Sequence, residues 1–151
     1  MKKVGAIAAG AAVFVLVGLA VMFHMVARPT AAQRPVVEIG GVSVHVALAT
    51  TTETRERGLG GKKDLANDEG MLFVFSNDGI YPFWMKDMLF SIDIIWISSS
   101  GRIVYIQPEL SPSTYPNSYG PSVPARYVLE VQAGFSALHG VMVGQQVGLQ
   151  I

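Results

Sequence analysis

The residues of this 151-residue chain that could do chemistry are carboxylates set among aromatic and apolar side chains. Asp93 interrupts the apolar run 92–97, and Asp87 follows the aromatic segment 81–84. An unpaired buried carboxylate is costly, so Asp93 needs either a specific partner or exposure to water. Asp87 and Asp93 could act together in general acid-base catalysis if burial raised the pKa of one of them.

A structural role is the competing interpretation, and the sequence favours it over catalysis. For Asp93 we expect an ion pair with Arg126, with backbone amides filling the remaining lone pairs. Asp68, Glu69 and Asp87 could hold a hard cation, but turn caps and ion pairs are commoner, and we predict no metal site. The candidate polar cluster, for binding or for structure, is Arg57, Lys86, Asp87, Asp93, Arg126 and Glu130.

Aromatic residues offer a second kind of site. Phe83, Trp84, Met85, Met88 and Trp96 could line a stacking groove for sugars or peptides, and they could equally form core. The irregular stretch 108–124 holds five prolines, and loops of that length are usually functional or disordered. Its two tyrosines complete the predicted interaction surface, which is Trp84, Tyr115 and Tyr119.

Several kinds of chemistry lack support in the sequence. The chain has no cysteine, which excludes disulfides and thiolate sites. Its three histidines, at positions 24, 45 and 139, are far apart, and neither a phosphate-binding loop nor a nucleophile elbow is present. Residues 35–151 carry seven basic and eleven acidic residues, which argues against nucleic acid binding. We predict no cofactor and no catalytic residue, and leave enzymatic activity open.

The elements that must position these residues are mainly strands. Residues 36–39 and 42–49 alternate around a Gly-Gly turn, which predicts a hairpin. A short helix is expected over 51–57, capped by Thr50 with Glu53 and stopped by Gly58. Strands are expected at 71–75, 88–97, 102–107, 126–131 and 145–151, with a turn at 76–79, a turn at 98–101 and a one-turn helix at 133–140.

This pattern predicts a mainly β fold. We expect an antiparallel β-sandwich or barrel of about seven or eight short strands with one or two short helices, preceded by a single transmembrane helix. The predicted division is a cytoplasmic tip (1–3), a transmembrane anchor (4–27), a linker (28–35) and an extracytoplasmic β domain (36–151).

Residues 4–27 carry no formal charge. A helix of this length spans roughly 36 Å, enough to cross a bilayer core of about 30 Å. A cleaved signal peptide is the alternative, because Thr30-Ala31-Ala32 resembles a cleavage site, although signal h-regions are only about 7 to 15 residues long. Lys2 and Lys3 place the N-terminus in the cytoplasm and the domain outside the inner membrane. Small residues in the span favour packing against other membrane subunits.

Several sequence blocks resemble the prokaryotic domain of unknown function 192. They are GLGGKKDLANDEGMLFVF, FWMKDMLFSIDIIWI, SSSGRIVYI, PARYVLEVQAG and GQQV, within residues 36–151. The resemblance implies a compact, mostly β fold, often exported, without an established activity. The positions that match the family motif are Arg57, Gly58, Leu59, Leu65, Gly70, Met71, Phe73, Trp84, Met85, Lys86, Asp93, Gly101, Tyr127, Glu130 and Gly134. The chain departs from it at Gly60, where the family usually has methionine, and at Asp87, where asparagine or glycine is frequent.

Two functional hypotheses follow from the sequence. The first is a membrane-anchored extracytoplasmic interaction module, such as a non-catalytic accessory or structural subunit of a membrane complex. The second is an envelope enzyme or a glycan- or peptide-binding domain that uses a groove around Trp84 and Asp93. An exposed Asp93 and Asp87 in a concave pocket beside Trp84 would support the second.

Overall fold

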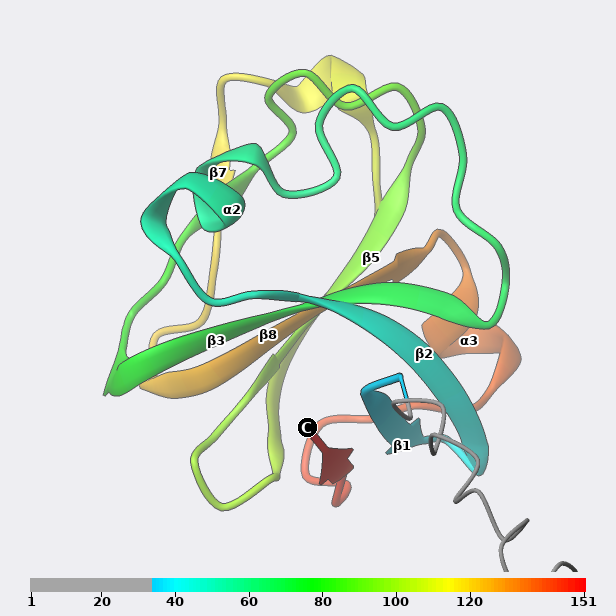
Figure 1. Ribbon diagram of the computed structural model, residues 1–151, viewed down its shortest axis with the longest axis vertical. Coiled ribbons are helices and arrows are strands. Elements are labelled where there is room, and N and C mark those ends of the chain that lie inside the picture. The colour runs from blue at the N-terminus through cyan, green and yellow to red at the C-terminus, as the bar shows by residue number, and fades with distance from the viewer. Residues whose placement is uncertain (1–33) are drawn as a thin grey trace, which may run out of the picture. The chain divides into compact units, whose positions relative to one another are not determined.

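The computed structural model describes residues 34–151, which form a curled sheet with short helices on its faces (Figure 1). The main sheet contains β1 (Val36–Ile39), β2 (Val42–Ala49), β3 (Glu69–Gly79), β5 (Ile92–Ile97), β6 (Ile103–Leu110), β8 (Ala125–Gln132) and β9 (Gly148–Gln150). A second sheet pairs β4 (Phe83–Trp84) with β7 (Ser118–Tyr119). The helices are α2 (Thr52–Arg57), the 3-10 helix η1 (Pro112–Thr114) and α3 (Phe135–Leu138).

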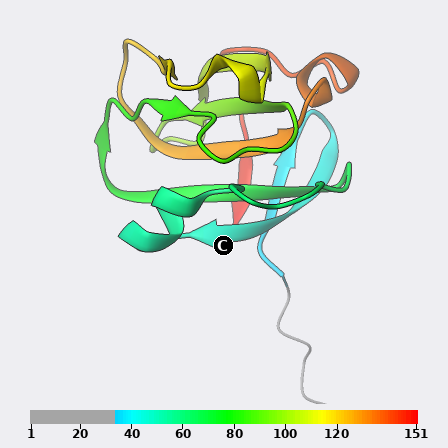
Figure 2. The ribbon, with the colours of Figure 1, turned by 90° about the horizontal axis from the view of Figure 1, so that it is seen from above.

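The strand order of the main sheet is β6-β5-β8-β3-β2-β1-β9. The predicted mainly β fold with few short helices is confirmed, and the sheet curls into a half-barrel, but it is not antiparallel throughout. The seven strands form one mixed sheet, in which β2 and β3 are parallel. Parallel neighbours need a crossover connection, which α2 and residues 58–68 provide. Figure 2 shows the curl of the sheet, because the red strand β9 lies at a steep angle to the green strand β3.

The two predicted hairpins are confirmed. Strands β1 and β2 pair around Gly40 and Gly41, which both have positive φ, as the tight turn requires. Strands β5 and β6 pair around the turn at 98–101. Strand β8, helix α3 and strand β9 also lie where the sequence pattern placed them.

Three local predictions were wrong. The strand expected at 88–97 begins at Ile92, so β5 is shorter than predicted. Residues 76–79 are not a turn but the end of β3, because a register shift lets Gly79 pair with Ala125 of β8. The capping box of α2 is one residue later than expected. Thr51 is the N-cap, and its partner is the side chain of Thr54.

Apolar side chains cover both faces of the sheet. Ile95 and Ile97 of β5 pack in one buried cluster, and Ile94 and Trp96 pack in another. Successive side chains of a strand point to opposite faces, so the two clusters lie on opposite sides of the sheet. Figure 1 shows α2 and β7 on one side and α3 on the other. Both faces of β5 are therefore covered by apolar side chains.

The proline-rich stretch 108–124 contains more structure than expected. It begins with the end of β6, continues through η1 and includes β7. Strand β7 pairs with β4, so this stretch packs beside the aromatic segment 81–84.

Within residues 34–151, no helix has the length and apolar composition needed to cross a membrane. The predicted anchor at 4–27, the tip before it and most of the linker lie outside the residues that the structure describes.

Candidate functional site

Asp93 is completely buried, and its partners are backbone amides. Oδ1 accepts hydrogen bonds from the N–H groups of Glu109 (2.8 Å) and Gly134 (3.0 Å), and Oδ2 accepts one from Ser136 (2.8 Å). Glu109 and Gly134 both have positive φ, which turns their amides out of regular strand pairing. These three hydrogen bonds join β5 to the end of β6 and to the start of α3. The role of Asp93 is therefore structural.

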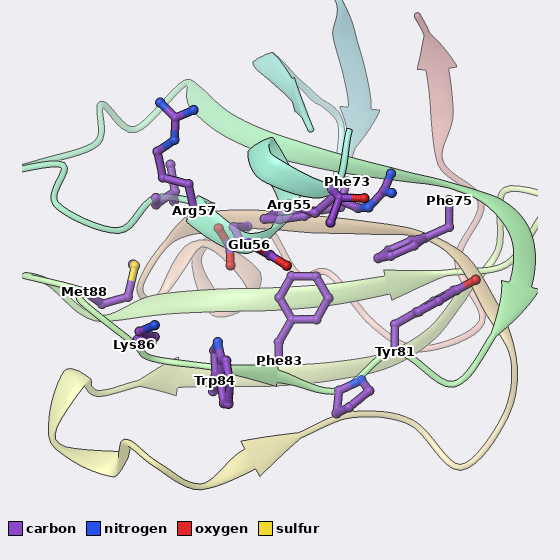
Figure 3. Close-up of a pocket in the computed structure, with 15 residues that line it drawn as sticks. Arg55, Glu56, Arg57, Phe73, Phe75, Tyr81, Phe83, Trp84, Lys86 and Met88 are labelled. Carbon is purple, nitrogen blue, oxygen red and sulfur yellow. The ribbon is translucent and has the colours of Figure 1, made fainter. Parts of the chain in front are cut away.

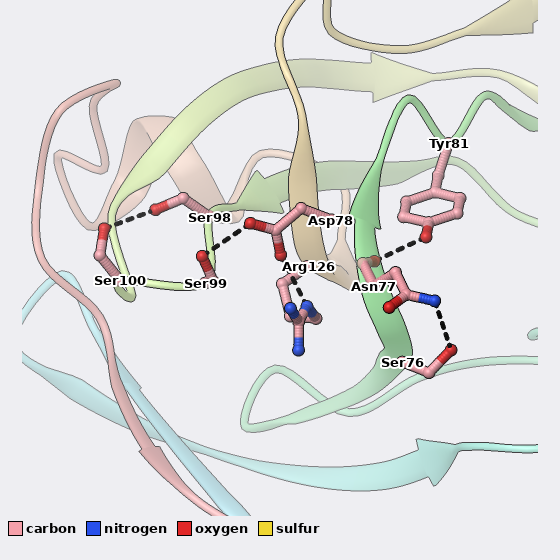
Figure 4. Close-up of polar contacts among 8 residues, drawn as sticks. All are labelled: Ser76, Asn77, Asp78, Tyr81, Ser98, Ser99, Ser100 and Arg126. Atoms are coloured by element: carbon pink, nitrogen blue, oxygen red, sulfur yellow. Dashed lines mark hydrogen bonds and ion pairs between the residues drawn. The ribbon is translucent and has the colours of Figure 1, made fainter.

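Arg126 does not pair with Asp93, so that prediction was wrong. Its Nε lies 2.6 Å from Oδ1 of Asp78, and Ser99 donates to the other oxygen of Asp78 at 2.8 Å (Figure 4). The hydrogen bond from Ser99, and then that from Arg126, lowers the pKa of Asp78. These contacts tie β8 to the extended end of β3 and to the β5–β6 turn. The register shift in β3 brings Asp78 within reach, which the sequence pattern could not reveal.

A pocket of about 290 Å³ lies between α2, β3, the segment 81–88 and β8 (Figure 3). Five aromatic side chains form part of its wall. The rings of Phe75 and Tyr81 stack at 3.6 Å, and the Phe73 and Phe83 rings meet edge to face at 4.7 Å. Its lining residues are Thr52, Arg55, Glu56, Arg57, Gly58, Leu59, Phe73, Phe75, Tyr81, Pro82, Phe83, Trp84, Lys86, Met88 and Glu130.

Glu130 of β8 is the buried acid of this pocket. Only 4% of the residue is exposed, and Oε2 has no hydrogen-bond partner among residues 34–151. Burial raises the pKa of Glu130 from its ordinary value of 4.5 to about 8, and the backbone amide of Leu59 acts in the opposite direction. Its carboxyl group is therefore mostly protonated at neutral pH, and it is a neutral hydrogen-bonding group inside an apolar wall.

The end of α2 lies directly over this carboxyl group. A Cβ atom added at Gly58 would lie 3.7 Å from Oε2 of Glu130 and 3.3 Å from the ring of Phe73. Gly58 has a φ of 52°, a conformation that glycine adopts without strain. Glycine at the helix C-terminus thus allows α2 to close one side of the pocket.

The predicted polar cluster is divided by the fold. Arg57, Lys86 and Glu130 line the same pocket, whereas Asp93 lies on the opposite face of the sheet. Asp87 does not line the pocket. It has a φ of 57°, and its carbonyl oxygen accepts a hydrogen bond from Gly61. Asparagine and glycine, the residues that the resemblance implies at this position, also adopt this left-handed conformation readily.

The predicted interaction surface is assembled as one unit. Phe83 is opposite Tyr119 and Trp84 is opposite Ser118 in the β4–β7 ladder. The rings of Trp84 and Tyr115 meet at 6.0 Å, and Trp84 is 51% exposed. Tyr119 packs against the core, so the exposed part of this surface is Trp84 with Tyr115.

Of the five residues expected either in a stacking groove or in the core, Phe83, Trp84 and Met88 line the pocket. Met85 and Trp96 are core. The sequence interpretation missed the wall supplied by α2 and β3, above all Arg55, Phe73 and Phe75. The two-residue spacing of Phe73 and Phe75 was the available signal, since it places both rings on one face of a strand.

The described part of the chain, residues 34–151, brings together no group of three histidine, aspartate or glutamate side chains suited to a metal ion.

Comparisons with known proteins give a family and a fold. One solved structure, described as a "putative transcription regulator" from Sinorhizobium meliloti, is 29% identical, with a TM-score of 0.71 over 77% of this chain and 92% of that one. A protein of unknown function from Novosphingobium aromaticivorans is 25% identical, with a TM-score of 0.70 over 80% of this chain and 89% of that one. No curated protein matches. The model of the family DUF192 (Uncharacterized ACR, COG1430) matches residues 35–149, and the chain belongs to this family.

Proposed function

We propose that residues 34–151 form a binding module for a small, mainly apolar ligand, held at the outer face of the cytoplasmic membrane by residues 4–27. The observation that carries the binding role is Oε2 of Glu130, buried without a partner in a pocket with an aromatic wall. Buried polar groups are hydrogen-bonded in the great majority of cases. A ligand that meets this oxygen supplies the missing contact.

The form of the pocket supports this role. Ligand sites are concave and largely apolar, with a few polar groups that set orientation, and their volumes begin at roughly 300 Å³. The volume here, about 290 Å³, suits a ligand of one or two rings or a short chain. The half-exposed Trp84 borders the entrance, where an aromatic ring gives contact area at a small cost in conformational entropy.

An accessory role in a membrane complex remains part of the proposal. The exposed pair of Trp84 and Tyr115 is the surface that would meet another subunit. Purification of the full chain in mild detergent tests this. A chain that always runs as a free monomer without a co-purifying protein would refute the subunit role and leave ligand binding standing.

For the alternative function as an enzyme, the candidate acidic residue is no longer Asp93. Asp93 cannot serve, because its two oxygens already accept three backbone hydrogen bonds on the other face of the sheet. Glu130 is the acid that such an enzyme, or a glycan- or peptide-binding domain, would use. Its raised pKa fits a general acid near neutral pH, and Glu56 is the other acidic residue that lines the pocket.

Regulation of transcription, which is named for one similar structure, is a weak candidate for this chain. Residues 35–151 carry seven basic and eleven acidic residues, and a net negative domain repels the phosphate backbone.

The binding role is tested with 2-naphthamide, a neutral ring probe, by equilibrium dialysis against the full chain in phosphatidylcholine nanodiscs, with empty nanodiscs as the blank. Trp84→Ala should weaken binding by about 3- to 10-fold, because an aromatic contact contributes roughly 0.5 to 1.5 kcal/mol. The matched control is Leu89→Ala, which removes another exposed apolar side chain, outside the pocket. It should leave the affinity unchanged.

Loss of affinity in both variants would indicate binding elsewhere on the apolar surface and would refute the pocket. Absence of saturable binding by any ring probe would refute the proposed function itself.

A further inference from the structure

The charges around the pocket are unequal. Two arginines of α2, Arg55 and Arg57, and Lys86 on the facing segment line it, against Glu56 and the buried Glu130. Arg55 is already occupied. Its Nη1 donates to the carbonyl oxygens of Thr50 at 2.7 Å and Val74 at 3.1 Å, and its guanidinium lies 5.3 Å from the ring centre of Phe75.

Arg57 and Lys86 are the cations left for a ligand. Both are exposed, and among residues 34–151 neither has a carboxylate within 4.0 Å. Glu130 does not balance them at neutral pH, because burial keeps its carboxyl group mostly protonated. Glu56 is the other acid that lines the pocket, so the lining residues together carry net positive charge.

The two ends of the pocket differ in chemistry. In Figure 3, Arg57, Lys86 and Met88 stand at one end, and the stacked pair of Phe75 and Tyr81 stands at the other, with Phe83 between them. The charged end is open to water, whereas the ring-lined end can hold apolar atoms. A complementary ligand therefore has one charged end and one apolar end.

We propose that the ligand is an amphiphilic anion, with a carboxylate or similar group beside Arg57 and Lys86 and an apolar body along Phe83 towards Phe75 and Tyr81. A neutral hydrogen-bonding group of the ligand meets Oε2 of Glu130 at the buried side of the pocket. This inference rests on the proposed function, since it names the chemical class of the ligand for the same pocket.

The test uses three probes with the same rings and different charge: 2-naphthoate, 2-naphthamide and 2-naphthylmethylammonium. Their affinities for the full chain in phosphatidylcholine nanodiscs are measured by dialysis at pH 7 and low salt. Naphthoate should bind about 5-fold more tightly than naphthamide, because two exposed cations are available to pair with its carboxylate. The ammonium probe should bind most weakly.

The double variant Arg57→Gln/Lys86→Gln should abolish the preference for naphthoate over naphthamide. The control Lys62→Gln/Lys63→Gln removes the same charge from residues that do not line this pocket, and should keep the preference. A preference that survives the first variant, or disappears in the control, would overturn the inference.

Each further outcome bears on one claim. Equal binding of naphthoate and naphthamide at the pocket would overturn the anionic ligand and leave the binding function standing. Tightest binding of the ammonium probe would also overturn it, in favour of a cation paired with Glu130. Binding of none of the three probes would instead refute the proposed function.

Discussion

Two buried acids of neighbouring strands have opposite roles in this fold. In the ladder between β5 and β8, Asp93 is opposite Val131 and Ile94 is opposite Glu130. Asp93 and Glu130 are therefore one position out of register and point to opposite faces of the sheet. On one face the acid is enclosed by α3 and the end of β6. On the other it borders a pocket.

Burial alone does not distinguish the two residues, because both are almost inaccessible to water. Their hydrogen bonding distinguishes them. Asp93 accepts three backbone amide bonds, whereas Oε2 of Glu130 has no partner within residues 34–151. A buried carboxylate with all its bonds made stabilises one structure, and an acid left unsatisfied is a candidate for contact with something else. Substitutions at these two positions should therefore differ in sign.

Asp93→Ala should give the largest effect. It leaves the amides of Glu109, Gly134 and Ser136 buried without an acceptor, and we expect a loss of about 3–5 kcal/mol in the free energy of unfolding. Urea denaturation of the full chain in nanodiscs, followed by tryptophan fluorescence, measures it. A loss below about 1 kcal/mol would remove the distinction between the two acids.

Glu130→Gln should have the opposite sign and a smaller magnitude. The folded-state pKa of Glu130 is raised, so its stabilising contribution is complete below the unfolded-state pKa of 4.5 and is lost as the pH rises through about 8. The wild-type melting temperature should thus fall between pH 5 and pH 8 and level off above. The neutral amide removes this decline, and the variant should melt at a higher temperature at pH 8.

The charged neighbours of Glu130 at the pocket are Arg55, Glu56, Arg57 and Lys86, with Tyr81 as a further titratable group. Scanning calorimetry at pH 5, 6, 7 and 8 measures the decline in both proteins. An equal decline in the variant would assign it to one of these neighbours or to another group, and would contradict the buried, protonated state of Glu130.

Arg126→Ala should have the smallest effect. Its ion pair with Asp78 is solvent-exposed in part, and such pairs contribute little to stability. A double-mutant cycle with Asp78→Ala isolates this contribution. If Arg126 instead supported Asp93, its removal would cost as much as Asp93→Ala, so the cycle also tests the separation of the two acids.

Most strands could be predicted because their evidence is local. Alternation and the Gly-Gly turn located β1 and β2, and apolar runs located β5 and β8. The parallel pairing of β2 and β3, and one curled sheet in place of a sandwich, depend on how distant segments meet. The continuation of β3 through Ser76 and Asp78 was missed for a related reason, since turn-type residues became strand through pairing with β8.

The site was predictable only in part. Lys86, Arg57 and Glu130 were identified as chemically suggestive, but nothing local indicated that one pocket unites them. The partners of Asp93 could not be predicted from the sequence, because every residue except proline offers a backbone N–H. We expected an arginine as the partner of Asp93 because a sequence shows which side chains are present and not which backbone amides are free. The unsatisfied oxygen of Glu130 is likewise a property of the tertiary structure.

The β4–β7 ladder bears on where a ligand would enter and leave the pocket. It joins only two residues of each strand, whereas the opposite side of the pocket belongs to a seven-stranded sheet. Short two-stranded pairs are marginally stable, and local opening has the lowest free-energy cost where few buried contacts are lost. The segment with Phe83 and Trp84 is therefore the wall with the lower barrier to opening, and a ligand would enter and leave on that side while the sheet stays intact.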